Sequence, residues 1–92
     1  MKIIIQRTKG FEKAFKKLRR RSQEVFIERL GIFIENPDHP LLKVHELKGN
    51  LKNHYAFSVS GDLRAIFTKQ VDNKQIVIIF TFIDIGTHNQ VY

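Results

Sequence analysis

The chain has 92 residues, 42% of them hydrophobic, which fits one small domain and excludes a disordered chain. Without cysteine it can form no disulfide and no thiolate metal site, and its apolar runs are shorter than the roughly 18 residues that span a membrane. A formal net charge of +7 predicts a polyanionic partner, either nucleic acid or an acidic protein, unless the domain is simply basic with no specific ligand.

The segment 2–7, KIIIQR, is rich in β-branched residues and predicts a strand at or near the edge of a sheet. Thr8 follows it and can cap a helix through its hydroxyl. The apolar residues after Thr8 recur at i, i+3, i+4 and i+7, which is one face of an amphipathic helix. They are Phe11, Ala14, Phe15 and Leu18.

A second helix is predicted after the basic run RRRS at 19–22, where Ser22 can serve as the N-cap. Pro37 and Pro40 disfavour helix at the residues before them and should end it. We expect the two helices to form an antiparallel hairpin. The apolar stripe of the second helix comprises Phe26, Ile27, Leu30, Phe33 and Ile34.

The second half of the chain predicts strands. Residues 38–53 are typical of a loop that contains one short extended piece, KVHEL. From Tyr55 the hydrophobic period changes to two, with Phe57 and Val59 on the same side as Tyr55, which indicates a half-buried strand.

Two more strands and two turns follow. SGD at 60–62 predicts a turn, LRAIFTK at 63–69 a strand, and VDNKQ at 71–75 a second turn. The run 76–83, IVIIFTFI, is apolar on both faces and predicts the central strand of the sheet, covered on both sides. The order β-α-α-β-β-β indicates a single α+β domain over 1–92, with a helix hairpin packed on one face of a mostly antiparallel sheet.

Arg64 is the most informative polar residue, because it lies inside a predicted strand between Leu63 and Ala65. It should project from the sheet face opposite the helices. A mid-strand arginine is costly to bury without a partner. We therefore expect it either to pair with a carboxylate, Asp62 or Asp84, or to bind a ligand anion such as a phosphate.

The apolar run ends in GTHNQVY at 86–92, which places His88 at a strand end and Tyr92 four residues later. Side chains at strand ends often reach a site, and an imidazole can accept or donate a proton near pH 7. The chain's four histidines, without cysteine or a helical i, i+4 pair, do not favour zinc. We expect no metal and no cofactor.

At this point the chain resembles a known family. The small basic β-α-α-β-β-β layout, the segment HELKGNLKNHYAFSVSGDLRAIF at 45–67 and the ending DIGTHNQVY at 84–92 are similar to the RelE/ParE superfamily of bacterial type II toxins. Within it, YafQ-type messenger-RNA endonucleases are the most alike. The resemblance implies a small RelE-like fold and a metal-independent endoribonuclease, an mRNA interferase that cleaves messages on the ribosome.

The resemblance also assigns residues by position. It implies that His45, Asp62 and His88 are catalytic, that Arg64 binds the phosphate, and that Tyr92 is an aromatic site residue. The chain departs from the YafQ pattern at Ser58, where that pattern has a histidine, and at Asp84, where it has an arginine. The lysines that RelE uses fall on Ala56 and Ser58.

Partners follow from the same resemblance. It implies a cognate antitoxin that keeps the toxin silent, the ribosome and mRNA as targets, oligomers only through the antitoxin, a cytoplasmic location and no membrane. The basic residues of the first helix and its surroundings would bind RNA, although the same charges could form an ordinary solvated helix face. The RNA-binding candidates are Lys13, Lys16, Lys17, Arg19, Arg20 and Lys52.

Two other functions remain open. A ParE-type toxin shares the fold but inhibits DNA gyrase by binding, and its activity would not depend on histidines. A non-catalytic binding protein with the same fold is the third hypothesis, and the departures at Ser58 and Asp84 keep it open.

Overall fold

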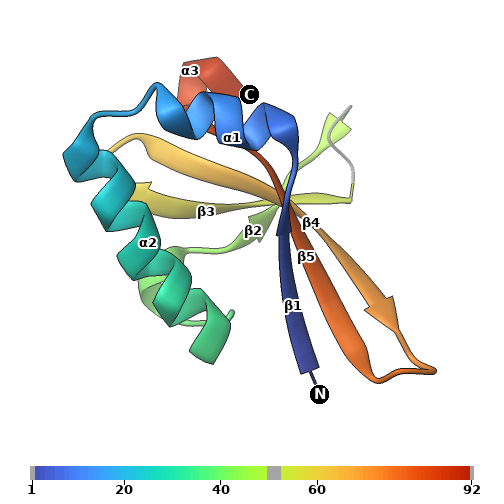
Figure 1. Ribbon diagram of the computed structural model, residues 1–92. Helices are drawn as coiled ribbons and strands as arrows, with labels where there is room; N and C mark the ends of the chain where they lie inside the picture. Colours follow the sequence, from blue (N-terminus) through green and yellow to red (C-terminus); the bar gives the residue numbers. More distant parts are fainter. Residues whose placement is uncertain (1, 50–52, 92) are drawn as a thin grey trace.

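Figure 1 shows the computed structural model, which describes residues 2–49 and 53–91 as three helices and a short 3₁₀ turn around one sheet. The predicted α+β architecture is confirmed. In chain order the elements are β1 (Lys2–Arg7), α1 (Lys9–Lys16), α2 (Arg20–Glu35), the 3₁₀ turn η1 (Pro40–Leu42), β2 (His45–Glu46), β3 (His54–Ser60), β4 (Leu63–Asp72), β5 (Val77–Thr87) and α3 (His88–Val91).

The five strands lie in the order β1-β5-β4-β3-β2. β1 pairs with β5 in parallel, and the other three pairings are antiparallel. A parallel pair needs a long crossover connection, and the chain between β1 and β5 contains both long helices and the other three strands. β1 is therefore an edge strand, as the sequence predicted. β5 lies beside it as an interior strand, and its predicted central position is wrong, because β4 occupies the centre of the five-strand order.

The helix ends match the sequence except at one position. The Thr8 hydroxyl accepts a hydrogen bond from the Phe11 amide at 3.1 Å, which confirms the predicted cap of α1. The predicted cap at Ser22 is wrong, because α2 begins at Arg20 and Arg19 occupies the N-cap position without a side-chain cap. The Gln23 side-chain amide donates to the Phe15 carbonyl at 2.9 Å and ties this first turn to α1 instead.

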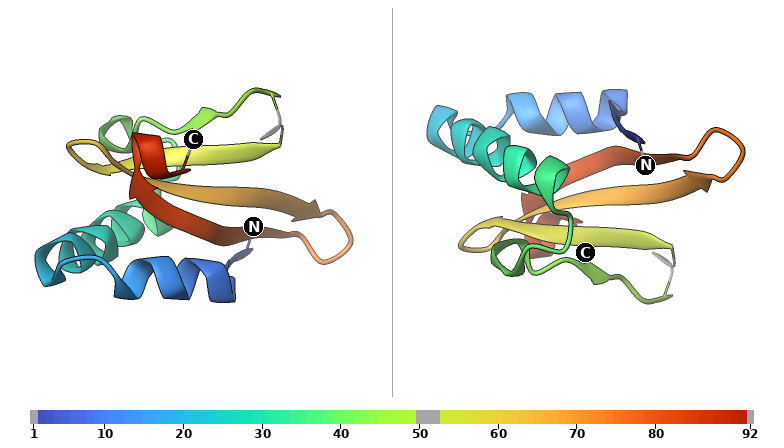
Figure 2. Two further views of the ribbon diagram at one scale, coloured as in Figure 1. Left: turned by 90° about the horizontal axis from the view of Figure 1, so that it is seen from above. Right: turned by 90° about the horizontal axis from the view of Figure 1, so that it is seen from below.

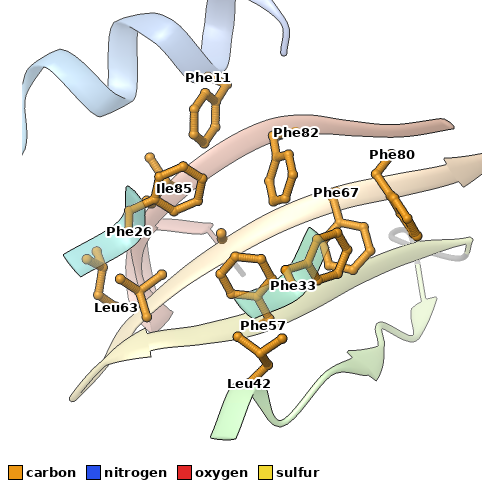
Figure 3. Packing of buried hydrophobic residues seen from close by; sticks show 12 residues of the cluster. Phe11, Phe26, Phe33, Leu42, Phe57, Leu63, Phe67, Phe80, Phe82 and Ile85 are labelled. Atoms are coloured by element: carbon orange, nitrogen blue, oxygen red, sulfur yellow. The ribbon is translucent and has the colours of Figure 1, made fainter. Parts of the chain in front are cut away.

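Helices α1 and α2 cover one face of the sheet, and a cluster of phenylalanine rings fills the space beneath them (Figures 2 and 3). Phe33 of α2 is fully buried at the centre of this cluster. The centroid of its ring lies 4.7 Å from that of Phe80 and 5.0 Å from that of Phe67. The rings of Phe57 and Phe82 lie at centroid distances of 5.3 and 5.9 Å. Edge-to-face rings at such spacings add to the stabilisation that burial provides.

The buried stripe of α2 is narrower than predicted. Phe26 and Phe33 are buried, whereas Ile27 is 58% exposed and Ile34 is 44% exposed. Helix α2 contacts the sheet along a narrow line that contains Phe26 and Phe33. Ile27 and Ile34 lie beside this line and remain exposed. Within the described ranges, no helix is both long enough and apolar enough to cross a membrane.

Strand β4 continues to Asp72 and β5 begins at Val77, so the predicted hairpin turn is shifted toward the C-terminus. Ile76, expected in the strand, is in the turn with φ at +56° and is 59% exposed. The tail after β5, for which the sequence predicted no structure, forms the short helix α3. This helix packs on the sheet face opposite α1 and α2 (Figure 2).

A small second cluster lies beneath α3 on that face. It consists of Leu47, Ala56 and Ile66, with Ile83 and Val91 packed against it. Each sheet face therefore has its own apolar cluster, and the larger one carries most of the buried area.

Replacing Phe33 with Ala should lower the free energy of unfolding by about 3–5 kcal/mol, because the truncation leaves a cavity among four aromatic rings. Chemical denaturation followed by circular dichroism measures this loss. Ile27→Ala is the matched control on the same helix and should stay within about 0.5 kcal/mol of the parent. Equal losses in the two variants would show that α2 packs differently.

Candidate functional site

The site candidates lie on the sheet face that α1 and α2 leave uncovered. In β4, Leu63 and Ala65 belong to the phenylalanine core, so Arg64 between them projects from the opposite face, as predicted. Arg64 is paired in register with Ser58 of β3 and with Gly86 of β5. Cross-strand partners share a face, so small side chains flank Arg64 on both sides.

The Arg64 guanidinium is held by main-chain carbonyls. Its Nη1 donates to the Gly61 carbonyl at 2.8 Å and to the Leu63 carbonyl at 3.1 Å. Of the two alternatives predicted for Arg64, the ion pair with Asp62 or Asp84 is not formed, since the ion pairs among residues 2–49 and 53–91 are Arg7–Glu12 and Arg20–Glu24. The second alternative, a bound anion, stays a prediction. Nη1 is thus anchored over the β3–β4 turn, while Nε and Nη2 carry further N–H donors.

Asp62 and His88 are brought together by the pairing of β4 with β5. The Asp62 Oδ2 accepts a hydrogen bond from the main-chain N–H of His88 at 3.3 Å. Asp62 precedes β4 and His88 follows β5, and the neighbouring residues Leu63 and Thr87 are register partners. Asp62 therefore binds the main chain at the start of α3.

His45 reaches the same face from the far edge of the sheet. It pairs with Ala56, and Leu47, two residues along, packs in the small cluster on this face. Strands are spaced by about 4.8 Å, so β2 lies roughly 10 Å from β4. The His45 Nδ1 lies 3.1 Å from the Lys43 carbonyl oxygen. A carbonyl only accepts, so the His45 Nδ1 is the donor in this contact.

The sheet surface between His45 and Arg64 carries short side chains. Ala56 and Ser58 of β3 lie between the strand of His45 and the strand of Arg64. These are the positions where the lysines of RelE would fall. Gly86 lies on the other side of Arg64, beneath α3. His54 also begins β3 on this face, further from Arg64.

Gly86 lets α3 approach β5 closely. A Cβ at this position would lie 2.8 Å from the Gln90 Oε1 and 3.2 Å from the Val91 Cγ1. The same Gln90 Oε1 accepts from the Thr87 amide at 2.8 Å. This close contact explains why glycine occupies position 86, before Thr87 and His88. The sequence alone did not reveal this reason.

The basic residues of the first helix divide between two hollows. Lys13 and Lys17 line a pocket of about 390 Å³ together with Asp84 and Gln90, beside the site. Lys16 instead lines a groove of about 460 Å³ between β1, α1 and α2. Residues four positions apart lie on the same side of a helix, so the sequence could have placed Lys13 and Lys17 together and apart from Lys16.

The remaining candidates are placed as follows. Arg19 and Arg20 are exposed at the junction of the two helices. Tyr92 and Lys52 lie outside the described residues, so their predicted roles stay predictions.

Replacing Gly86 with Val should push α3 off the sheet, because the new side chain occupies the space of Gln90 and Val91. The amides of Thr87 and His88 should then lose their hydrogen bonds, which NMR amide shifts and exchange rates detect. Gly31→Ala, where nothing lies within 4 Å of the added Cβ, is the control and should stabilise α2 by up to about 1 kcal/mol. Unchanged Thr87 and His88 amides in the Val variant would contradict the packing described.

No protein-family model and no curated protein matches the chain. Solved structures do. A chain of the E. coli DinJ–YafQ toxin–antitoxin complex aligns over 100% of this chain and 99% of its own, with 20% identity and a TM-score of 0.76.

Two further structures match at similar levels. The YoeB/ParE toxin from Agrobacterium tumefaciens has 15% identity, covers 96% of this chain and 99% of its own, and gives a TM-score of 0.71. The archaeal RelE–RelB complex from Pyrococcus horikoshii has 22% identity, covers 99% of this chain and 100% of its own, and gives a TM-score of 0.67. The protein therefore has the fold of the RelE/ParE toxins, with YafQ among its structural neighbours.

Proposed function

We propose that the protein is the toxin of a type II toxin–antitoxin system and cleaves messenger RNA on the ribosome without a metal ion. The observation that supports this most directly is the common sheet face of Arg64, His45 and the Asp62–His88 pair. The fold similarity to YafQ and RelE toxins supports the same class.

RNA cleavage of this kind has simple chemical needs. The 2′-hydroxyl loses a proton and its oxygen attacks the adjacent phosphorus, while the leaving 5′-oxygen gains a proton. The product is a 2′,3′-cyclic phosphate. Charge that builds on the phosphate must be stabilised, and each positioned acid or base contributes about 10²–10⁴ in rate.

Arg64 is suited to hold the phosphate. Its Nη1 is fixed by the carbonyls of Gly61 and Leu63, so the guanidinium plane is oriented before RNA binds. Nε and Nη2 form a fork that matches two phosphate oxygens. In the proposed reaction this fork stabilises the charge that develops on the non-bridging oxygens.

His45 and His88 supply the proton transfers from opposite sides of Arg64. The contact between Nδ1 and the Lys43 carbonyl orients the His45 ring, and in the proposed reaction His45 accepts the 2′-hydroxyl proton. His88 then serves as the acid for the 5′-oxygen. Asp62 positions His88 through its main chain and adds a carboxylate to the site. Tyr92, four residues beyond His88, would stack on a base or donate to the phosphate.

We also propose a cognate antitoxin and the ribosome as partners. The DinJ–YafQ structure is described as a toxin–antitoxin complex, and the archaeal structure as a RelE–RelB complex. The net charge of +7 favours an acidic antitoxin segment and ribosomal RNA as binding surfaces. Assembly into oligomers would occur through the antitoxin, in the cytoplasm.

Inhibition of DNA gyrase is the alternative within the same fold, since one matched structure is described as a YoeB/ParE toxin. That activity works by binding and should not need imidazoles. Induced cells would then show DNA breaks and filaments with intact messages.

Replacing both His45 and His88 with Ala should abolish growth arrest and reduce message cleavage, with each single change costing about 10²–10⁴ in rate. Primer extension on a message from induced cells measures the cuts. Both side chains are exposed, and the Asp62 bond uses the His88 main chain, so the fold should persist. His39→Asn is the control, because it keeps an acceptor for the Leu41 amide. Undiminished cleavage in the double variant would rule out the proposed chemistry.

Replacing Lys13 and Lys17 with Ala should weaken RNA binding and flatten its salt dependence. Two lost phosphate contacts to single-stranded RNA reduce the slope of log K against log salt by about 1.4. Fluorescence anisotropy with a labelled oligonucleotide at several salt concentrations gives the slope. The charge-matched control replaces Lys69 and Lys74, which are exposed on β4 and in its hairpin turn. If the control variant shows the same reduction in the slope of log K against log salt, RNA binding depends on the net charge of the protein and not on Lys13 and Lys17.

A further inference from the structure

The pocket lined by Lys13, Lys17, Asp84 and Gln90 lies where β1 stops pairing with β5. Beyond that point α1 runs along β5, and α3 packs on the opposite face at the same end of the strand (Figure 2). The volume of about 390 Å³ is within the range of small-ligand sites. The proposed cleavage reaction does not use this pocket.

A β-bulge sets the position of Asp84. The register between β4 and β5 shifts between Ile66 and Phe67, so Ile83 is the extra residue on β5. Ile83 packs against the small apolar cluster, and Asp84 lines the pocket. Bulges commonly re-aim a side chain next to a functional site. The Asp84 Oδ1 accepts from the Ile85 amide at 2.8 Å, which orients the carboxylate.

Among the described residues that line this pocket, Asp84 is the one carboxylate, and Lys13 of α1 and Lys17 at the C-cap of α1 line the same pocket. Asp84 takes part in neither of the ion pairs found among residues 2–49 and 53–91. A pocket with two cations and one oriented carboxylate suits a nucleotide, because ammonium groups bind phosphate and a carboxylate accepts from base N–H groups.

The pocket adjoins the proposed cleavage site. Asp84 is two residues before Gly86, or about 7 Å along the strand, and Gly86 is the register partner of Arg64. Gln90, which lines the pocket, belongs to the same short helix as His88. A nucleotide in the pocket would therefore be next to the phosphate held by Arg64.

We infer that this pocket binds a guanine nucleotide that flanks the scissile phosphate, an inference that rests on the proposed RNA cleavage. Guanine presents two adjacent donors, N1–H and the 2-amino group, which match the two oxygens of Asp84. Adenine and cytosine each place a ring-nitrogen acceptor beside one amino group, and uracil has carbonyls on both sides of its N–H. Adenine, cytosine and uracil would therefore each place a hydrogen-bond acceptor next to a carboxylate oxygen, which is also an acceptor.

The test measures binding apart from cleavage. The 5′-monophosphates of guanosine, inosine and adenosine are titrated into the purified protein, and amide shifts are followed by NMR. Guanosine monophosphate should perturb residues 13–17 and 84–90 and bind roughly fivefold or more tightly than the adenosine compound. Inosine monophosphate, which lacks the 2-amino group, should bind with intermediate strength.

Asp84→Asn is the informative variant. It raises the net charge, so every nucleotide should bind somewhat more tightly, but the preference for guanosine over adenosine should disappear. Asp38→Asn makes the same charge change at an exposed position away from the pocket and should keep the preference. The ratio of the affinities, which charge alone does not alter, therefore isolates base recognition.

The outcomes separate the two proposals. No perturbation of residues 13–17 and 84–90 at millimolar guanosine monophosphate, or a guanosine preference that survives in Asp84→Asn, would overturn the subsite. Loss of stability without any change in the affinity ratio would show that Asp84 only balances the lysines. If the preference is found but messages are not cleaved, the proposed reaction fails and the guanine site stands. Cut sites mapped in cells should carry a flanking guanine that Asp84→Asn no longer selects.

Discussion

The insertion of Phe33 between the rings of the sheet is the contact on which the rest of the structure depends. It places α2, and with it α1, on one face of the sheet, and this concentrates the apolar surface there. The opposite face then needs only a small cluster of its own. A domain of this size has little hydrophobic surface to distribute. Grouping most of it on one side leaves the other side available for polar chemistry.

On that polar face, position is controlled by main-chain contacts more than by ion pairs. Main-chain carbonyls hold Arg64, the Lys43 carbonyl contacts the His45 Nδ1, and Asp62 binds the main chain of His88. Under the proposed function, a site held in this way is formed before RNA binds, which lowers the cost of reaching a productive geometry.

The departures from the YafQ pattern also become physically understandable. Ala56 and Ser58 give a bed of short side chains beside Arg64, and the substitution at Asp84 coincides with a bulge and a pair of lysines from α1. Under the inferred guanine site, Asp84 would accept hydrogen bonds from a base at a position where the resemblance to YafQ predicts an arginine. The same fold can in this way keep a cleavage site and alter the nucleotide that it accepts.

The sequence by itself determined the layers, the strand faces and the cap at Thr8, because hydrophobic period and capping chemistry act over a few neighbouring residues. It also indicated the side from which Arg64 projects. The start of α2, the exposure of Ile27 and the helix after β5 depend on contacts between distant segments, which local patterns do not record. The hydrogen bond between Asp62 and the His88 amide, and the presence of Asp84 in one pocket with Lys13 and Lys17, are properties of the folded chain alone, since strand register and a single bulged residue bring these segments to the same place.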